Sequence, residues 1–123
     1  MRNKKILWVE DSPLSKRVIE TLLQPLDCLV DIANTGEESV ALCIRNHYDF
    51  IFMEIELRGI DGIMAARLIR EQEGPGCHVP IVALTAHDDV KMKAQALAAG
   101  MDDFLIKPLT PQIAQDVLAK YFI

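Results

Sequence analysis

Short apolar stretches alternate along the chain with segments in which apolar residues recur every three or four positions. Five stretches have the length and composition of β-strands, namely Ile6–Val9, Leu29–Ala33, Phe50–Met53, Ile81–Leu84 and Phe104–Ile106. The first, third and fourth are almost continuously apolar, as in strands covered on both faces, whereas Asp31 interrupts the second and places it nearer an edge. The alternation predicts a doubly wound α/β fold, with a parallel sheet, helices on both faces and right-handed crossovers.

Short polar residues and one glycine mark the ends of the expected helices. The helix starts are indicated by Ser12 before Pro13, Thr35 three residues before Glu38, Asp61 before Gly62, and Thr110 before Pro111. Gly100 follows an alanine-rich segment, where a glycine would cap the end of a helix. The 123 residues contain neither a linker nor an internal repeat, so we expect one domain, residues 1–123.

Composition and charge narrow the functions that the domain can have. Thirteen Lys and Arg against 18 Asp and Glu give a net charge of −5, and we expect no direct contact with nucleic acid. No apolar stretch approaches the ~20 residues that cross a bilayer, and the first residues do not resemble a signal peptide. We therefore expect no membrane contact by this domain and a cytoplasmic location. Three widely spaced cysteines without a CxxC pair indicate reduced thiols.

The residues that follow the apolar stretches carry the candidate chemistry. Ligands of open parallel sheets bind beyond the carboxyl ends of the strands. Here those ends are followed by Glu10, Asp11, Glu54, Thr85 and Lys107. Three carboxylates brought together repel one another unless a cation lies between them, and their hard oxygens suit Mg²⁺. A lysine and a hydroxyl are suitable partners for a phosphoryl group, so the pattern indicates a Mg²⁺ and phosphoryl site.

These motifs together resemble the receiver domain of two-component response regulators. The similarity rests on ILWVEDS, DFIFMEIELRGIDG, VPIVALTAH and GMDDFLIKP, which occur in the family's order and cover essentially the whole chain. The segments VPIVALTAH and AAGMDDFLIKP are most similar to receivers of hybrid sensor kinases. The resemblance implies a flavodoxin-like fold of three layers, with five parallel strands in the order 2-1-3-4-5 and five helices.

The resemblance also implies a set of metal ligands. Glu10 and Asp11 match the acidic pair that holds Mg²⁺ in the family, and the main-chain carbonyl of Glu56 matches a further ligand. Glu54 stands at the phosphoacceptor position beside them, where its carboxylate would also face the metal.

Position 54 departs from the family, in which the phosphoacceptor is an aspartate. The assignment of Glu54 follows from Asp61 and Gly62, which lie seven and eight residues later, as in the family's motif. The extra methylene extends the carboxylate by roughly 1.5 Å, and an error of that size can cost ~10²-fold in the rate of in-line transfer. It also brings negative charge within reach of Thr85 and Lys107. The glutamate is either natural or introduced to imitate the activated state, and the sequence leaves both open.

The residues of the expected switch are likewise implied by the resemblance. Thr85 matches the hydroxyl residue that moves on activation, and Lys107 matches the lysine that pairs with the phosphoryl oxygens. Phe104 matches the aromatic switch position, and Pro108 follows Lys107 through a peptide bond that is usually cis in the family. If Glu54 bonds Thr85 or Lys107, Phe104 should lie inward without a phosphoryl donor.

Three functions remain open from the sequence. The first is a regulatory receiver, not itself an enzyme, that switches a protein-interaction surface and is phosphorylation-deficient or phosphomimetic; it could belong to a larger hybrid histidine kinase. The second is a competent phosphoacceptor that takes phosphate from a histidine kinase with Mg²⁺. The third is an unrelated enzyme or flavin carrier, against which the acidic Glu10–Pro13 loop lacks residues that cradle a flavin phosphate.

The expected partners follow from the same resemblance. They are a histidine kinase or phosphotransfer domain, or a downstream output domain or protein. We also expect that the fourth helix, fifth strand and fifth helix provide a homodimer surface.

Overall fold

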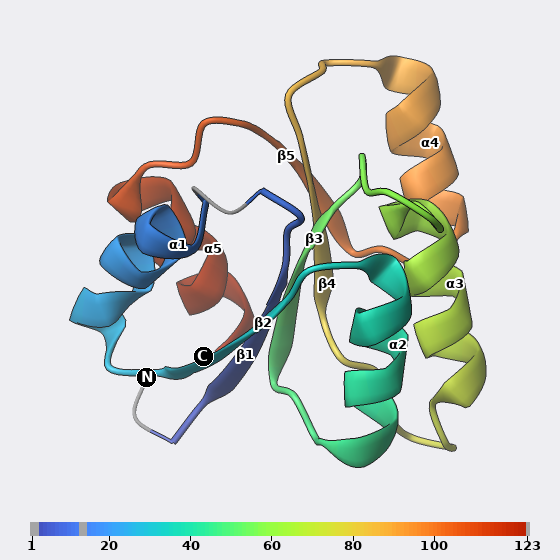
Figure 1. The fold of residues 1–123 in the computed structure, drawn as a ribbon, viewed down its shortest axis with the longest axis horizontal. Coiled ribbons are helices and arrows are strands. Elements are labelled where there is room, and N and C mark those ends of the chain that lie inside the picture. The colour runs from blue at the N-terminus through green and yellow to red at the C-terminus, as the bar shows by residue number, and fades with distance from the viewer. Residues whose placement is uncertain (1–2, 13–14, 123) are drawn as a thin grey trace.

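Figure 1 shows the computed structural model of the chain, which describes residues 3–12 and 15–122. Strands and helices alternate from end to end, as the hydrophobic pattern predicts. In chain order they are β1 (Lys5–Val9), α1 (Ser15–Leu23), the short 3-10 helix η1 (Gln24–Leu26), β2 (Leu29–Ala33), α2 (Gly36–Arg45), β3 (Phe50–Glu54), α3 (Gly62–Gln72), β4 (Ile81–Thr85), α4 (Val90–Ala98), β5 (Asp103–Ile106) and α5 (Pro111–Tyr121).

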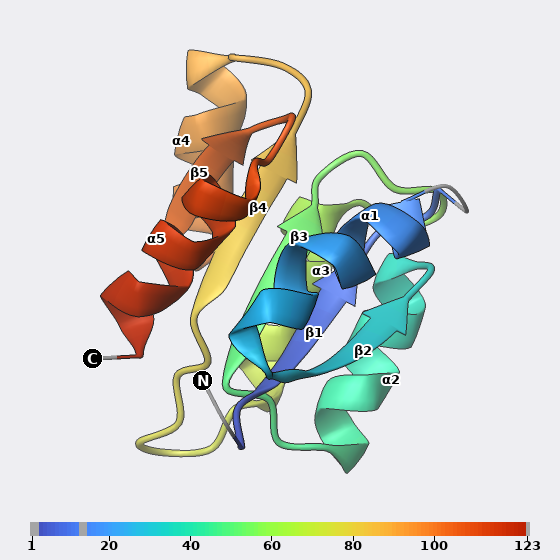
Figure 2. The same cartoon turned by 90° about the vertical axis from the view of Figure 1, so that its left-hand side faces the viewer.

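The five strands form one parallel sheet with the order β2-β1-β3-β4-β5. Helices α1 and α5 cover one face, and α2, α3 and α4 cover the other, which gives three layers (Figures 1 and 2). The predicted flavodoxin-like fold, strand order and helix count are therefore confirmed. Within the described part of the chain, no helix is both long and apolar enough to span a membrane.

The central strands are apolar throughout because each buries both of its faces. In β3, Ile51 and Met53 pack into the core beneath α2, α3 and α4, while Phe50 and Phe52 pack into the core beneath α1 and α5. Trp8 of β1 lies against Phe52, with ring centroids 4.4 Å apart, and is only 4% exposed. The central strands are thus packed on both faces of the sheet.

The predicted helix ends are confirmed where the structure describes them. Side-chain oxygens of Thr35, Asp61 and Thr110 each accept a hydrogen bond from a main-chain amide in the first turn of α2, α3 and α5, over 2.8–3.1 Å. Gly100 has a φ of 104° just beyond α4, a conformation that favours glycine. The described part of α1 begins at Ser15, and the expected start at Pro13 and Leu14 lies outside the described residues.

Candidate functional site

The parallel strands bring the predicted site residues to one edge of the sheet, at the top in Figure 1. Glu10 follows β1, and Lys107 follows β5. Glu54 and Thr85 are the last residues of β3 and β4, one residue further into each strand than the apolar pattern indicates. The register explains their proximity, because Glu54 pairs with Leu84, the neighbour of Thr85.

Lys107 is the centre of a buried ion-pair cluster. Its Nζ donates a hydrogen bond to Glu10 Oε2 over 2.7 Å, and it also forms an ion pair with Glu54 Oε2. Glu10 and Glu54 are each 5% exposed, so their carboxylates depend on this one ammonium group for compensation. The main-chain amide of Lys107 is anchored as well, since it donates to the carbonyl of Thr85 over 2.7 Å. The cluster thus joins the ends of β1 and β3 to the loop after β5.

Burial and pairing act in opposite directions on the two charges of this cluster. Burial raises the pKa of Glu54 to about 7; the ammonium of Lys107 lowers it in part, and the neighbouring Glu10 raises it. Burial also lowers the pKa of Lys107, but contacts with Glu10 and Glu54 outweigh it, so that the pKa lies above its ordinary value. Lys107 therefore remains a cation at neutral pH, whereas Glu54 exchanges its proton near pH 7.

Thr85 is held by a group that the sequence analysis did not assign to it. Its hydroxyl is fully buried and donates to Oε1 of Glu56 over 3.2 Å. The same hydroxyl oxygen accepts the main-chain amide of His87 over 3.2 Å, and His87 Nε2 lies 3.2 Å from Glu56 Oε1. No sequence pattern indicated this contact, because Glu56 lies beyond the end of β3 in an irregular segment.

Of the two contacts expected for Glu54, with Thr85 or with Lys107, the structure shows the one with Lys107. Among the described contacts, Glu54 forms an ion pair with Lys107, whereas the Thr85 hydroxyl bonds the side chain of Glu56. The contact with the ammonium of Lys107 takes up Oε2 of Glu54. The other oxygen of Glu54 accepts the amide of Glu56 through a long 3.4 Å contact.

Phe104 and Pro108 lie where the resemblance places them. Phe104 is partly buried and packs against the core beneath α2, α3 and α4, which is an inward position. The peptide bond between Lys107 and Pro108 is cis. The roles of both residues in switching stay predictions.

The expected metal site offers oxygen donors of the kind that Mg²⁺ binds, and two of its carboxylates pair with Lys107. Carboxylate oxygens are the ligands that Mg²⁺ prefers. However, Glu10 and Glu54 direct theirs at Lys107, and Asp11 alone of the three carboxylates stands outside that ion-pair cluster. Among residues 3–12 and 15–122, no group of three His, Cys, Asp or Glu side chains is placed to hold a metal ion. In this arrangement the ammonium of Lys107 compensates the charges of Glu10 and Glu54.

Comparison with known proteins agrees with this architecture. Residues 6–119 match the family described as response regulator receiver domain. The sensor histidine kinase GacS of Pseudomonas protegens is 36% identical over 120 residues, which cover 95% of this chain and 13% of that kinase. The chain thus spans only a small part of this relative's length.

Two solved structures are similar over nearly the whole chain. One is the receiver domain of the sensor histidine kinase PA1611 from Pseudomonas aeruginosa PAO1, with a magnesium ion in its active site cleft. It is 39% identical with a TM-score of 0.87, and 97% of each chain is covered. The other is the receiver domain of Ssk1 from Saccharomyces cerevisiae, co-crystallised with the histidine phosphotransfer protein Ypd1. It is 26% identical with a TM-score of 0.88, covering 98% of this chain and 89% of that one.

Proposed function

The chain belongs to the response regulator receiver domain family, and we propose that it is a receiver whose output surface is set without phosphorylation. In this proposal Glu54 occupies the phosphoacceptor position and makes the domain phosphorylation-deficient. The domain is regulatory, as its family is, and its relatives include the receivers of hybrid sensor kinases. We propose further that residues 1–123 form a single domain, that this domain is located in the cytoplasm, and that it is part of a histidine kinase signalling system.

The ion pair between Glu54 and Lys107 is the observation that carries the proposal. Lys107 is the cation expected to pair with phosphoryl oxygens, and here it is already neutralised by buried carboxylates. A glutamate supplies at most about one negative charge, when it is ionised, whereas a phosphoryl group carries about −1.5 to −2 and three acceptor oxygens. The imitation is therefore partial. The inward position of Phe104 agrees with a partly switched state.

In this proposal, Mg²⁺ binds only when Lys107 does not pair with Glu10. We propose Glu10, Asp11 and the main-chain carbonyl of Glu56 as its ligands, in a state in which Lys107 has left Glu10. Such an ion supplies positive charge to phosphoryl oxygens. The magnesium ion in the PA1611 receiver supports the choice of metal.

The proposed partners are a histidine kinase or phosphotransfer protein, or a downstream output domain. The complex of Ypd1 with the Ssk1 receiver supports the first class. The surface of α4, β5 and α5 is the face that we propose for output or for a homodimer. Its exposed apolar side chains support this, and they are Val90, Leu97, Ile106 and Ile113.

The test is to restore an aspartate at position 54 and look for phosphorylation. The unchanged protein should stay unlabelled when incubated with acetyl phosphate and Mg²⁺, whereas Glu54→Asp should gain the mass of one phosphoryl group. The matched control is Glu54→Asn, which has the length of aspartate but no nucleophilic oxygen and should not be labelled. Intact-mass spectrometry measures the phosphoryl mass added to each of the three proteins.

Two outcomes would contradict the proposal. Ready labelling of the unchanged protein at Glu54 would favour the alternative, a competent receiver that takes phosphate from a histidine kinase with Mg²⁺. Failure of Glu54→Asp to label would show that Glu54 is not what prevents phosphorylation.

A further inference from the structure

Lys107 and Thr85, the two residues expected to contact phosphoryl oxygens, each contact a different carboxylate. Lys107 pairs with Glu54, and the Thr85 hydroxyl donates to Glu56. Glu54 and Glu56 come from the same segment, at the end of β3 and just beyond it. The side chain of Glu56 therefore has a contact that its expected role, a main-chain carbonyl ligand, does not explain.

The Thr85 hydroxyl has one proton and lies completely away from solvent. A buried hydroxyl without an acceptor costs about 1–3 kcal/mol, so an acceptor must be supplied from within the protein. The structure offers two, Glu56 Oε1 at 3.2 Å and the sulfur of Met92 at 3.7 Å. A carboxylate is the stronger acceptor, because a thioether sulfur accepts only weakly.

The Glu56 carboxylate is itself held in position at this edge. His87 Nε2 lies 3.2 Å from the same Oε1 atom, and the His87 amide donates to the Thr85 hydroxyl oxygen. The amide of Glu56 points at Glu54 Oε1, over 3.4 Å. Glu56, Thr85 and His87 thus form a closed set of contacts next to the ion-pair cluster of Lys107.

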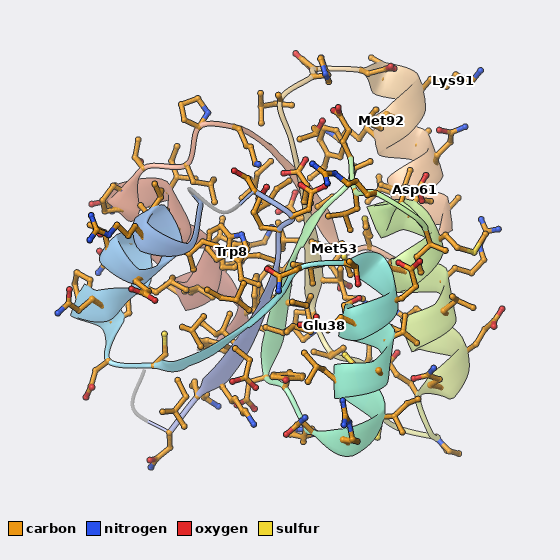
Figure 3. All side chains as sticks on the ribbon, in the orientation of Figure 1. Trp8, Glu38, Met53, Asp61, Lys91 and Met92 are labelled. Carbon is orange, nitrogen blue, oxygen red and sulfur yellow. The ribbon has the colours of Figure 1, made fainter. Side chains whose placement is uncertain are left out.

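The set of contacts reaches helix α4 through Met92. Met92 packs, partly buried, against the same core as Phe104. In Figure 3 it lies on the side of α4 that faces the loops at the carboxyl edge, whereas Lys91 points away. A change in the Thr85 rotamer therefore changes a contact of α4.

We propose that the Glu56 side chain is a positioning residue that holds the Thr85 hydroxyl, so that Glu56 and Glu54 share the contacts of a single phosphoryl group. The inference rests on the proposed function and deepens it, because the state of the switch is then set by two carboxylates rather than by Glu54 alone. Removal of the Glu56 carboxylate should release Thr85 while the pairing of Glu54 with Lys107 persists.

The experiment measures the Thr85 side chain by NMR in metal-free buffer without a phosphoryl donor. Three-bond couplings to the Thr85 methyl carbon report its χ1 rotamer, and the Met92 methyl signal reports the α4 contact. Glu56→Ala should change the ratio of Thr85 rotamers about tenfold and shift the Met92 signal. Glu56→Gln keeps an oxygen acceptor and should retain the rotamer of the unchanged protein. Glu71→Ala removes an exposed carboxylate of α3 and serves as the control.

Unchanged Thr85 couplings in Glu56→Ala would overturn the inference, as would an equal change in Glu71→Ala. The half-exposed position of the Glu56 side chain makes unfolding of the variant unexpected. Labelling of Glu54→Asp by acetyl phosphate is a separate measurement. If that labelling fails while Glu56→Ala releases Thr85, only the phosphorylation part of the proposed function is contradicted.

Discussion

The buried carboxylate of Glu54 should make the stability of the protein depend on pH. Its pKa rises from the ordinary 4.5 to about 7 in the folded state, because burial disfavours the charged form. Between these two values the folded protein holds a proton that the unfolded chain has released. The free energy of unfolding should therefore be highest below pH 4.5 as far as Glu54 is concerned, and should fall as the pH rises to 7.

The size of this effect follows from the same two values. One pKa unit between the folded and unfolded states corresponds to about 1.4 kcal/mol, so the Glu54 contribution amounts to about 3 kcal/mol over the window. Solvent screening is weak because the residue is 5% exposed. Glu54→Gln has no proton to lose there. Its stability relative to the unchanged protein should thus increase by about 3 kcal/mol between pH 4.5 and pH 7.5.

Urea denaturation at several pH values, in metal-free buffer, measures this difference. The single tryptophan, Trp8, is buried in the core and adjacent to the site strand, so its fluorescence follows unfolding. The attraction between the ionised Glu54 carboxylate and Lys107 grows as Glu54 loses its proton, and it is already contained in the folded-state pKa of about 7, so it adds no separate contribution. The control Glu71→Gln removes an exposed carboxylate and should show no such trend. Parallel stability curves for Glu54→Gln and the unchanged protein would refute the reasoning.

Two further predictions test the cation and the backbone of the site. Mg²⁺ should raise the melting temperature of Lys107→Met more than that of the unchanged protein, because the ammonium no longer competes for Glu10. At a hundredfold excess of Mg²⁺ over its dissociation constant, binding stabilises the folded protein by about 2.7 kcal/mol. Equal shifts of the melting temperature in the two proteins would contradict the competition. Gly62→Ala should lower the free energy of unfolding by about 1–3 kcal/mol, because a Cβ would collide with the carbonyl of Glu54 and lie 2.9 Å from Ile55 Cα. Urea titration measures it, and Gly74→Ala, whose Cβ would enter open space, should be nearly neutral.

The fold could be predicted because its determinants are local in the sequence. The uninterrupted apolar residues of β3 and β4 require cover on both faces, and alternation with helical segments then leads to a parallel sheet. Thr35, Asp61 and Thr110 mark helix starts through hydrogen bonds from amides only three residues away. Parallel strands end at the same edge, so even the meeting of Glu10, Glu54, Thr85 and Lys107 followed from their places after the strands.

The sequence by itself determined which groups reach this edge, and only the tertiary structure decided which of them pair. Lys107 bonds Glu10, which lies 97 residues earlier in the chain. Whether the Glu10 carboxylate pairs with Lys107 or with a metal ion depends on where the side chains lie in the folded site. Glu56 follows β3 in an irregular loop, so no periodicity assigns its side chain to Thr85. The pKa of Glu54 likewise depends on burial by distant segments. Local patterns encode main-chain geometry, whereas the partners of a flexible charged side chain are selected by distance and desolvation, which exist only once the chain has folded.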